Sequence, residues 1–91
     1  DFGRTPKVNA NGGRDHHPGV YSLAFAGGGI SGGQVYGASD KKGIEPSSGD
    51  CTPADIHATV FKAMGINPNA ELHDQLDRPY RICDGKPLPI V

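Results

Sequence analysis

The chain has 91 residues, enough for one small domain, and 35% of them are hydrophobic. Nine lysine and arginine residues against ten acidic ones leave a formal net charge of −1, which predicts no nucleic-acid partner. No run of about 18 apolar residues is present, so we expect no membrane span. The sequence opens on Asp1 within a motif and lacks an initiator methionine, so we expect residues 1–91 to be a single segment of a longer protein.

The first half of the chain is predicted to hold loops and one short hairpin. Residues 1–19 are rich in turn-forming residues and are expected to be a loop. In residues 20–26, "VYSLAFA", large side chains alternate with small ones, which predicts a strand that buries one face deeply. A glycine-rich stretch and residues 34–36 follow, and we expect a glycine-linked hairpin between the two strands. Residues 37–50 are expected to be a polar loop.

The clearest helix is predicted over residues 52–65. Thr52 is a suitable N-cap, Pro53 suits the first helical position, and Asp55 follows three residues after the cap. Gly65 is expected to end the helix in the left-handed conformation. Apolar residues recur at helical spacing and predict the buried face, which consists of Ile56, Val60, Ala63 and Met64.

The last part of the chain is predicted to hold little regular structure. Leu72 and Leu76 are spaced to face one side of a short helical turn, and the proline-rich tail is expected to be extended. Cys51 and Cys83 either form one disulfide or remain thiols, and the sequence does not choose between these states.

The stretch "GGRDHHPG", residues 12–19, is the strongest candidate for chemistry. Asp15, His16 and His17 offer carboxylate oxygen and imidazole nitrogen, which suit Zn²⁺ and similar divalent ions. Adjacent residues of a loop can converge on one ion, because a loop lacks the alternation of a strand. Pro18 restricts His17 to an extended conformation and is expected to turn it away. A solvated polar turn is the other interpretation, and the sequence leaves both open.

Other candidate residues stand in weaker patterns. Arg4 and Arg14 are candidates for anion binding, because a guanidinium matches phosphate or sulfate bidentately. The pattern G-x-G-x-x-G occurs at Gly27, Gly29 and Gly32, but no helix is predicted after it, so we interpret these as hairpin glycines. The remaining histidines are assigned structural roles: His57 on the helix, and His73 in a hydrogen-bonded cluster with Asp74 and Asp77.

Three stretches of the sequence, taken together, resemble one family. They are "DFGRTPKVNANGGRDHHPGVYSLAFAGGGISGGQVYGASD", "TPADIHATVFKAMGI" and "LHDQLDRP". In this order they are similar to the C-terminal part of an uncharacterised, mostly exported bacterial family of the alkaline phosphatase and sulfatase superfamily. The resemblance runs over nearly the whole chain. It implies an α/β fold, namely the C-terminal fragment of an alkaline phosphatase-like domain with a short strand hairpin and one main helix.

The resemblance also implies roles for individual residues. "DFGR" is similar to an element in which a strand ends in a metal-ligating acidic residue, so Asp1 is implied as a ligand. The superfamily often has histidine where this chain has Phe2. "RDHHP" is similar to a later loop that returns a histidine to the metal pair, which implies His16 and, second, Asp15 as ligands. Arg4 and Arg14 would then flank the site and hold an anion.

The activity implied by the resemblance is the hydrolysis of a phosphate or sulfate ester. A nucleophile attacks in line while a divalent metal (Zn, Ca or Mg) stabilises charge on the transferred group. The nucleophile and the first metal aspartates are expected outside this sequence, so the chain would be inactive alone and would hold part of a metal site or no metal. The partners implied are the remainder of the parent polypeptide or other protein chains, and the location implied is exported, periplasmic or extracellular.

Two rival hypotheses come from other classes of protein. In one, the parent protein is a non-catalytic structural or binding component of a larger assembly, which Phe2 in place of histidine favours. In the other, the chain is a free-standing small binding domain. For the first hypothesis, we expect "DFGR" and "RDHHP" to lie close together. We also expect marginal stability, with Leu23 and Phe25 either exposed or covered by other chains.

Overall fold

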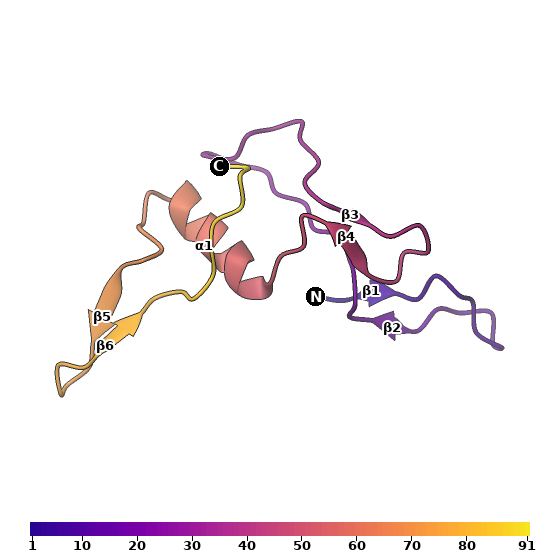
Figure 1. The fold of residues 1–91 in the computed structure, drawn as a ribbon, viewed down its shortest axis with the longest axis horizontal. Helices are drawn as coiled ribbons and strands as arrows, with labels where there is room; N and C mark the ends of the chain where they lie inside the picture. Colours follow the sequence, from indigo (N-terminus) through magenta and orange to yellow (C-terminus); the bar gives the residue numbers. More distant parts are fainter. The chain divides into compact units, whose positions relative to one another are not determined.

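The computed structural model describes all of residues 1–91 and contains one helix and three small antiparallel sheets of two strands each (Figure 1). The chain divides into two compact units, one of residues 1–24 with 35–50 and the other of residues 25–34 with 51–91. The first unit holds two of the sheets, and the second holds the helix and the third sheet. In chain order, the elements are β1 (Gly3–Arg4), β2 (His16–His17), β3 (Ala38–Ser39), β4 (Pro46–Ser48), α1 (Pro53–Ala63), β5 (Glu71–His73) and β6 (Pro79–Arg81).

The β1–β2 pair corrects the expectation that residues 1–19 are all loop. Gly3 pairs with His17 and Arg4 pairs with His16 in an antiparallel register. Gly3 is required here, because a Cβ at this position would lie 2.6 Å from the carbonyl oxygen of Val20. The connection between the strands turns around Asn9, whose side-chain oxygen accepts hydrogen bonds from the backbone of residues 11 and 13.

The β3–β4 pair lies inside the stretch expected to be a polar loop. Ser39 pairs with Pro46, and the register shifts between residues 38 and 39. Asp40 closes the connecting turn, because its carboxylate accepts a hydrogen bond of 2.8 Å from the N–H of Ile44. That bond is the main reason why the pKa of Asp40 is lowered, and neighbouring backbone N–H groups add to the effect. Local hydrogen bonding, with little apolar burial, therefore organises this hairpin.

Helix α1 confirms the predicted helix and both of its ends. The Thr52 hydroxyl accepts a hydrogen bond from the N–H of Asp55, and the Asp55 carboxylate accepts one from the N–H of Thr52, which completes a capping box. At the other end, Gly65 has a φ of 79°, and the N–H of Ile66 bonds to the carbonyl of Phe61 at 2.9 Å. This is the Schellman arrangement that satisfies the last helical carbonyls.

The predicted buried face of this helix is wrong. Val60 is 39% exposed and Met64 is 70% exposed, whereas Ala58 and Thr59 are fully buried. The buried face is set by a segment distant in sequence, residues 83–88, which lies along the helix. Its Leu88 donates a backbone hydrogen bond of 2.9 Å to the Thr59 hydroxyl. Ala58, Cys83 and Leu88 are the buried hydrophobic residues of the chain, so the core is small.

The predicted strand at residues 20–26 and its hairpin to residues 34–36 are not present. These residues belong to no sheet, and no backbone hydrogen bond holds residues 20–26. Leu23 is 53% exposed and Phe25 is half-buried. An alternating pattern forms a ladder only when a second strand supplies donors and acceptors, and no segment of this chain does so here.

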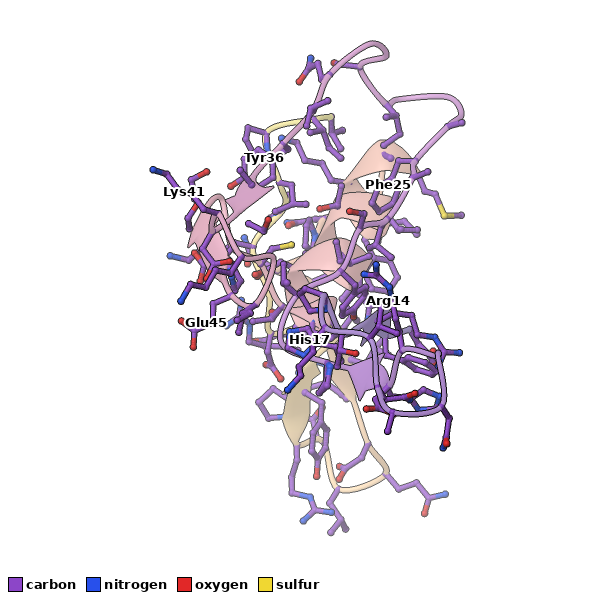
Figure 2. All side chains as sticks on the ribbon, turned by 90° about the vertical axis from the view of Figure 1, so that its right-hand side faces the viewer. Arg14, His17, Phe25, Tyr36, Lys41 and Glu45 are labelled. Atoms are coloured by element: carbon purple, nitrogen blue, oxygen red, sulfur yellow. The ribbon has the colours of Figure 1, made fainter.

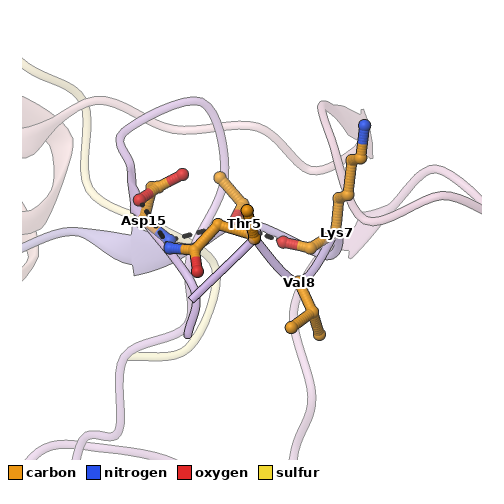
Figure 3. Close-up of a pocket in the computed structure, with 6 residues that line it drawn as sticks. Thr5, Lys7, Val8 and Asp15 are labelled. Carbon is orange, nitrogen blue, oxygen red and sulfur yellow. Dashed lines mark hydrogen bonds between the residues drawn. The ribbon is translucent and has the colours of Figure 1, made fainter. Parts of the chain in front are cut away.

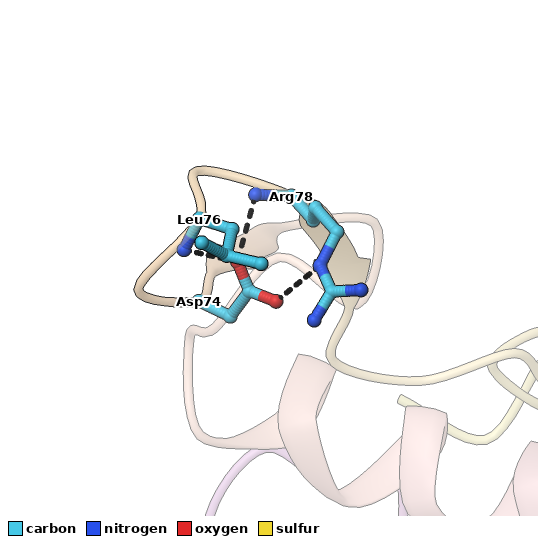
Figure 4. Close-up of polar contacts among 3 residues, drawn as sticks. All are labelled: Asp74, Leu76 and Arg78. Carbon is cyan, nitrogen blue, oxygen red and sulfur yellow. Dashed lines mark hydrogen bonds and ion pairs between the residues drawn. The ribbon is translucent and has the colours of Figure 1, made fainter.

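The third sheet corrects the expected helical turn around Leu72 and Leu76. Leu72 lies in β5 directly opposite Tyr80 of β6. Figure 4 shows the turn between them, in which the Asp74 carboxylate binds the backbone N–H groups of Leu76 and Arg78 and forms a 2.6 Å ion pair with the Arg78 side chain. The backbone hydrogen bond from Arg78 is the main cause of the lowered pKa of Asp74. His73 takes no part in this cluster.

Candidate functional site

The β1–β2 ladder brings the two stretches of candidate ligands together. "DFGR" contributes β1 and "RDHHP" contributes β2, with Arg4 opposite His16. The expectation that these stretches lie close together is therefore confirmed. Because successive side chains of a strand point to opposite faces, His16 shares a face with Arg4, and His17 lies on the other face. Arg14 and His17 are labelled in Figure 2, where the side chains of this part of the chain are drawn.

His16 is exposed and its ring lies against the ring of Phe2. The two ring centroids are 3.9 Å apart, and the planes are tilted by 34°. No hydrogen bond from within the chain reaches either ring nitrogen of His16. The side chain thus keeps its full capacity for a ligand, and Phe2 fixes the position of the ring.

His17 is already engaged in a structural contact. Its Nε2 lies 2.8 Å from the backbone carbonyl oxygen of Ile44. A carbonyl only accepts hydrogen bonds, so this nitrogen carries the hydrogen and donates it. The contact ties β2 to the turn between β3 and β4, within the same compact unit. His17 therefore has a structural role. This agrees with the expectation that Pro18 turns His17 away from the proposed metal site.

Asp15 lies on the loop side of the ladder. Its Oδ1 accepts a hydrogen bond of 3.1 Å from the side-chain amide of Asn9, and its backbone N–H donates to the Thr5 hydroxyl at 3.0 Å. Asp15 also contributes to an open pocket, which Figure 3 shows in close-up. The pocket is lined by Thr5, Lys7, Val8, Asn9, Ala10 and Asp15. Neighbouring residues 15 and 16 thus have different partners.

Asp1 is exposed at the start of the chain, two residues before the ladder pair of Gly3 and His17. Within the chain, no three side chains of histidine, cysteine, aspartate or glutamate form a group that could hold a metal ion. The structure therefore brings the stretches containing Asp1, Asp15 and His16 together, without forming a complete set of ligands from these 91 residues.

Arg4 and Arg14 lie across the ladder from each other. Nη1 of Arg4 donates a hydrogen bond of 3.3 Å to the backbone carbonyl of Arg14. Nη1 of Arg14 donates one of 3.3 Å to the backbone carbonyl of Thr5. The Arg4 guanidinium also lies 5.4 Å from the centroid of the Phe2 ring. Neither arginine is in an ion pair, since the one salt bridge of the chain joins Asp74 and Arg78.

A family model described as "Protein of unknown function (DUF1501)" matches residues 1–90. The chain belongs to the DUF1501 family. This match spans both compact units, so the β1–β2 ladder and helix α1 are parts of one DUF1501 region. Neither the curated proteins nor the solved structures give a match to this chain. The family description names no reaction, so the chemistry has to be argued from the residues.

The remaining candidates in this DUF1501 chain are structural or lie outside the ladder. Cys83 is buried as a thiol, which donates to the carbonyl of Ala54 at 3.1 Å. His57 is exposed on α1. Gly27 and Gly29 form a turn, and no helix begins there, so the features of a dinucleotide site are absent. No helix of the chain is long and apolar enough to cross a membrane.

Asn9 and Thr5 were not singled out by the sequence patterns, and Phe2 was noted only as a departure from histidine. Asn9 and Thr5 orient Asp15, and Phe2 contacts both His16 and Arg4. The signal for this turn was available in the sequence, because Asn9 and Asn11 stand just before Gly12 and Gly13, and asparagine and glycine are typical turn residues. The role of Phe2 depends on the strand pairing, which no local pattern reveals.

Proposed function

We propose that this DUF1501 chain is the C-terminal part of a metal-dependent hydrolase-like protein that acts on phosphate or sulfate esters. In this proposal Asp1, Asp15 and His16 are metal ligands, and Arg4 and Arg14 bind the anionic group. The parent protein has the α/β architecture of the alkaline phosphatase superfamily and is exported. The chain contributes ligands and is inactive alone, because the nucleophile belongs to another part of the parent polypeptide.

The observation that carries this proposal is the pairing of Gly3–Arg4 with His16–His17. Two stretches separated by a loop, each of which contains a candidate ligand and an arginine, are brought together by this pairing. Carboxylate oxygen and imidazole nitrogen are the donors that zinc and related divalent ions take in catalytic sites. Ester hydrolysis needs both a cation and positive donors for the oxyanion, and this ladder holds candidates for both.

The fit of a metal ion to this chain is partial. A catalytic metal takes three or more protein ligands, and the 91 residues form no such group. The proposal therefore requires further ligands from outside the chain. Asp15 would also have to exchange its contact with Asn9 for the metal, whereas His16 has both ring nitrogens available.

The proposed larger architecture is supported by apolar side chains that this chain leaves in water. Leu23 lies in a segment with no strand partner, and α1 leaves Val60 39% exposed and Met64 70% exposed. In an α/β domain, a strand of this composition pairs with other strands, and such a helix face packs on the sheet. The same observations support partners that are the remainder of the parent polypeptide.

The second candidate is a non-catalytic structural or binding role in a larger assembly. Phe2 favours it, because the ring contacts His16 at the position where a histidine would supply another ligand. The contact between Asp15 and Asn9 favours it as well. In this alternative, the ladder is a folded turn that presents its arginines to a partner.

The metal content and activity of the intact parent protein test the proposal. Metal is measured by plasma mass spectrometry after dialysis, and hydrolysis is measured with aryl phosphate and aryl sulfate esters. His16→Gln is the test variant, and His73→Gln, an exposed histidine on β5, is the matched control. We expect His16→Gln to lower metal content and activity and the control to leave both unchanged. Equal metal content in the two variants, or no hydrolysis by the wild-type protein, would favour the non-catalytic alternative.

A further inference from the structure

Asn11 differs from the other three asparagines of the chain, because its side-chain amide has no hydrogen bond within the chain. The side chain of Asn9 binds the Asp15 carboxylate at 3.1 Å. That of Asn67 accepts a bond of 2.9 Å from the backbone two residues on, and that of Asn69 accepts one of 3.0 Å from an arginine of β6. Asn11 is exposed in the connection between β1 and β2. Its side chain is therefore the asparagine amide most free to rotate.

The residue after Asn11 is a glycine in an open position. Gly12 has a φ of 75°, and a Cβ built on it would meet nothing within 4 Å. Because glycine has no Cβ, its backbone nitrogen is easily approached by the side-chain carbonyl carbon of the preceding residue. The other asparagines lack this neighbour, since Asn67 precedes a proline, which has no N–H, and Asn9 and Asn69 precede alanines.

One backbone hydrogen bond opposes the approach of these two groups. The N–H of Gly12 donates to the carbonyl of Asn9 at 3.1 Å, and this bond has to open before the nitrogen can react. Residues 10–13 are all exposed, so opening this turn uncovers no buried apolar side chain. Local openings of this kind have a low free-energy cost. We therefore expect the turn to slow a reaction between Asn11 and Gly12 without preventing it.

We propose that Asn11 is a site of spontaneous deamidation with water as the only co-reactant. The Gly12 nitrogen loses its proton to solvent and forms a bond to Cγ of Asn11, while the Cγ–Nδ2 bond breaks and Nδ2 takes up a proton and leaves as ammonia. Water then opens the resulting succinimide at one of its two carbonyls. The products have aspartate or isoaspartate at position 11, each with a new carboxylate. This inference goes beyond the proposed function, because it requires no metal, nucleophile or ester.

The isoaspartate product is expected to release Asp15. In isoaspartate the backbone runs through the side chain, which adds one methylene between residues 11 and 12. Asn9 binds on both sides of that link: its Oδ1 accepts from the N–H groups of residues 11 and 13, and its N–H donates to the carbonyl of Gly13 at 2.7 Å. A longer link displaces these groups, so Asn9 loses the contacts that hold its side chain against Asp15.

Peptide mapping of the intact parent protein, incubated at neutral and at mildly alkaline pH, tests the site. Mass spectrometry detects the replacement of the amide NH₂ by OH, and electron-transfer fragmentation distinguishes isoaspartate from aspartate. We expect Asn11 to react at least about tenfold faster than Asn9 and Asn69, which are controls within the same protein. The rate should rise with pH, because the deprotonated nitrogen is the attacking group.

Hydrogen exchange tests the structural consequence. In the incubated protein we expect the N–H groups of Asn9 and Gly13 to exchange about tenfold faster or more, because their bonds span the lengthened link. The N–H of Ile44, bound to Asp40 in the other hairpin of the same unit, should not change. Asn11→Gln retains an amide that cyclises more slowly and should preserve slow exchange. Asn11→Asp, measured before incubation, adds the charge without lengthening the backbone and should also preserve it.

Three results would overturn the inference. The first is deamidation of Asn11 in urea together with an intact Asn11 in the folded protein, because the turn would then protect it. The second is a rate at Asn11 no greater than that at Asn9. The third is unchanged exchange of Asn9 and Gly13 in the isoaspartate product, because Asp15 would then stay bound. Deamidation with faster exchange, in a parent protein that takes up no metal and hydrolyses no ester, would support this inference and remove the proposed hydrolase function.

Discussion

The ring of His16 lies against the ring of Phe2, with centroids 3.9 Å apart, on the face of the ladder that also carries Arg4. The contact holds the imidazole against the Phe2 ring, and neither ring nitrogen has a hydrogen-bond partner within the chain. Phe2 is also the residue that stands in place of a histidine in the proposed likeness to the alkaline phosphatase superfamily. Position 2 therefore distinguishes the metal-dependent hydrolase from the non-catalytic alternative, because a metal-ligating side chain there would add a ligand to an incomplete site.

Replacement of Phe2 by histidine is expected to strengthen metal binding. A second imidazole beside His16 adds a nitrogen donor to a set that is short of ligands. We expect Phe2→His to raise the affinity of the chain for Zn²⁺, measured by competition with a chromophoric chelator. Phe2→Leu is the control for the loss of the ring alone and is expected to give no gain. Equal affinities of the two variants would mean that position 2 does not face the proposed metal.

The hydrogen bond between Thr59 and Leu88 is expected to stabilise the second compact unit. Thr59 is fully buried, and its hydroxyl accepts from the N–H of Leu88 at 2.9 Å while donating to the carbonyl of Asp55 at 2.7 Å. Thr59→Val leaves a buried N–H without a partner and is expected to lower the free energy of unfolding by about 1–3 kcal/mol. Urea denaturation measures this, and Thr59→Ser, which keeps the hydroxyl, should lose less. A larger loss for serine than for valine would mean that methyl packing dominates at this position.

Substitutions on the two faces of α1 are expected to have different effects in the chain and in the parent protein. In the 91-residue chain, Val60→Asp should cost less stability than a charge at Ala58, because Val60 is 39% exposed whereas Ala58 is fully buried. Ala58→Asp should cost several kcal/mol, because it places a charge in the core. In the parent protein, Val60→Asp should become strongly destabilising if Val60 is covered there. Thermal melts of both proteins make the comparison, and a small effect of Val60→Asp in both would show that this face stays in water.

Acid is expected to weaken the contact between α1 and the C-terminal segment through Asp55. Hydrogen bonds from the backbone of Lys86, and then of Thr52, hold the pKa of Asp55 below its ordinary value of 3.8. A lowered pKa in the folded state means that the stabilisation is present above pH 3.8 and is lost as the pH falls through the lower folded value. Stability measured between pH 7 and pH 2 should therefore fall less steeply in Asp55→Asn than in the wild-type chain. Parallel curves for the two proteins would contradict this role for Asp55.

Local sequence signals predicted some elements of this chain, and distant contacts decided the others. The ends of α1 were predictable, because Thr52, Asp55 and Gly65 act within a few residues of their own positions. The buried face of α1 was not, because it depends on Leu88, which lies 29 residues from its partner Thr59. The alternating pattern around Leu23 predicted a strand, but no strand forms without a neighbour to pair with.

For the candidate site, the proximity of its two stretches was predicted, whereas the contacts of its individual side chains were not. The stretches around Asp1 and His16 were expected to lie together, and the β1–β2 register shows that they do. That expectation came from resemblance to a family, since nothing local in either stretch specifies the pairing. The contact of Asp15 with Asn9 and the position of Phe2 against His16 were not expected, because both depend on how the ladder and its loop fold. The identity of the ligands stays a prediction.

A crystal structure of the intact parent protein grown with Zn²⁺, with anomalous diffraction recorded at the zinc edge, tests the central claim most directly. The account predicts an anomalous peak about 2.0–2.3 Å from a ring nitrogen of His16. A carboxylate oxygen of Asp1 or Asp15 should bind the same ion or a second ion about 4 Å away. An intact structure in which the Asp1 and Asp15 carboxylates and the His16 ring lie more than about 10 Å apart, with no metal beside His16, would contradict it.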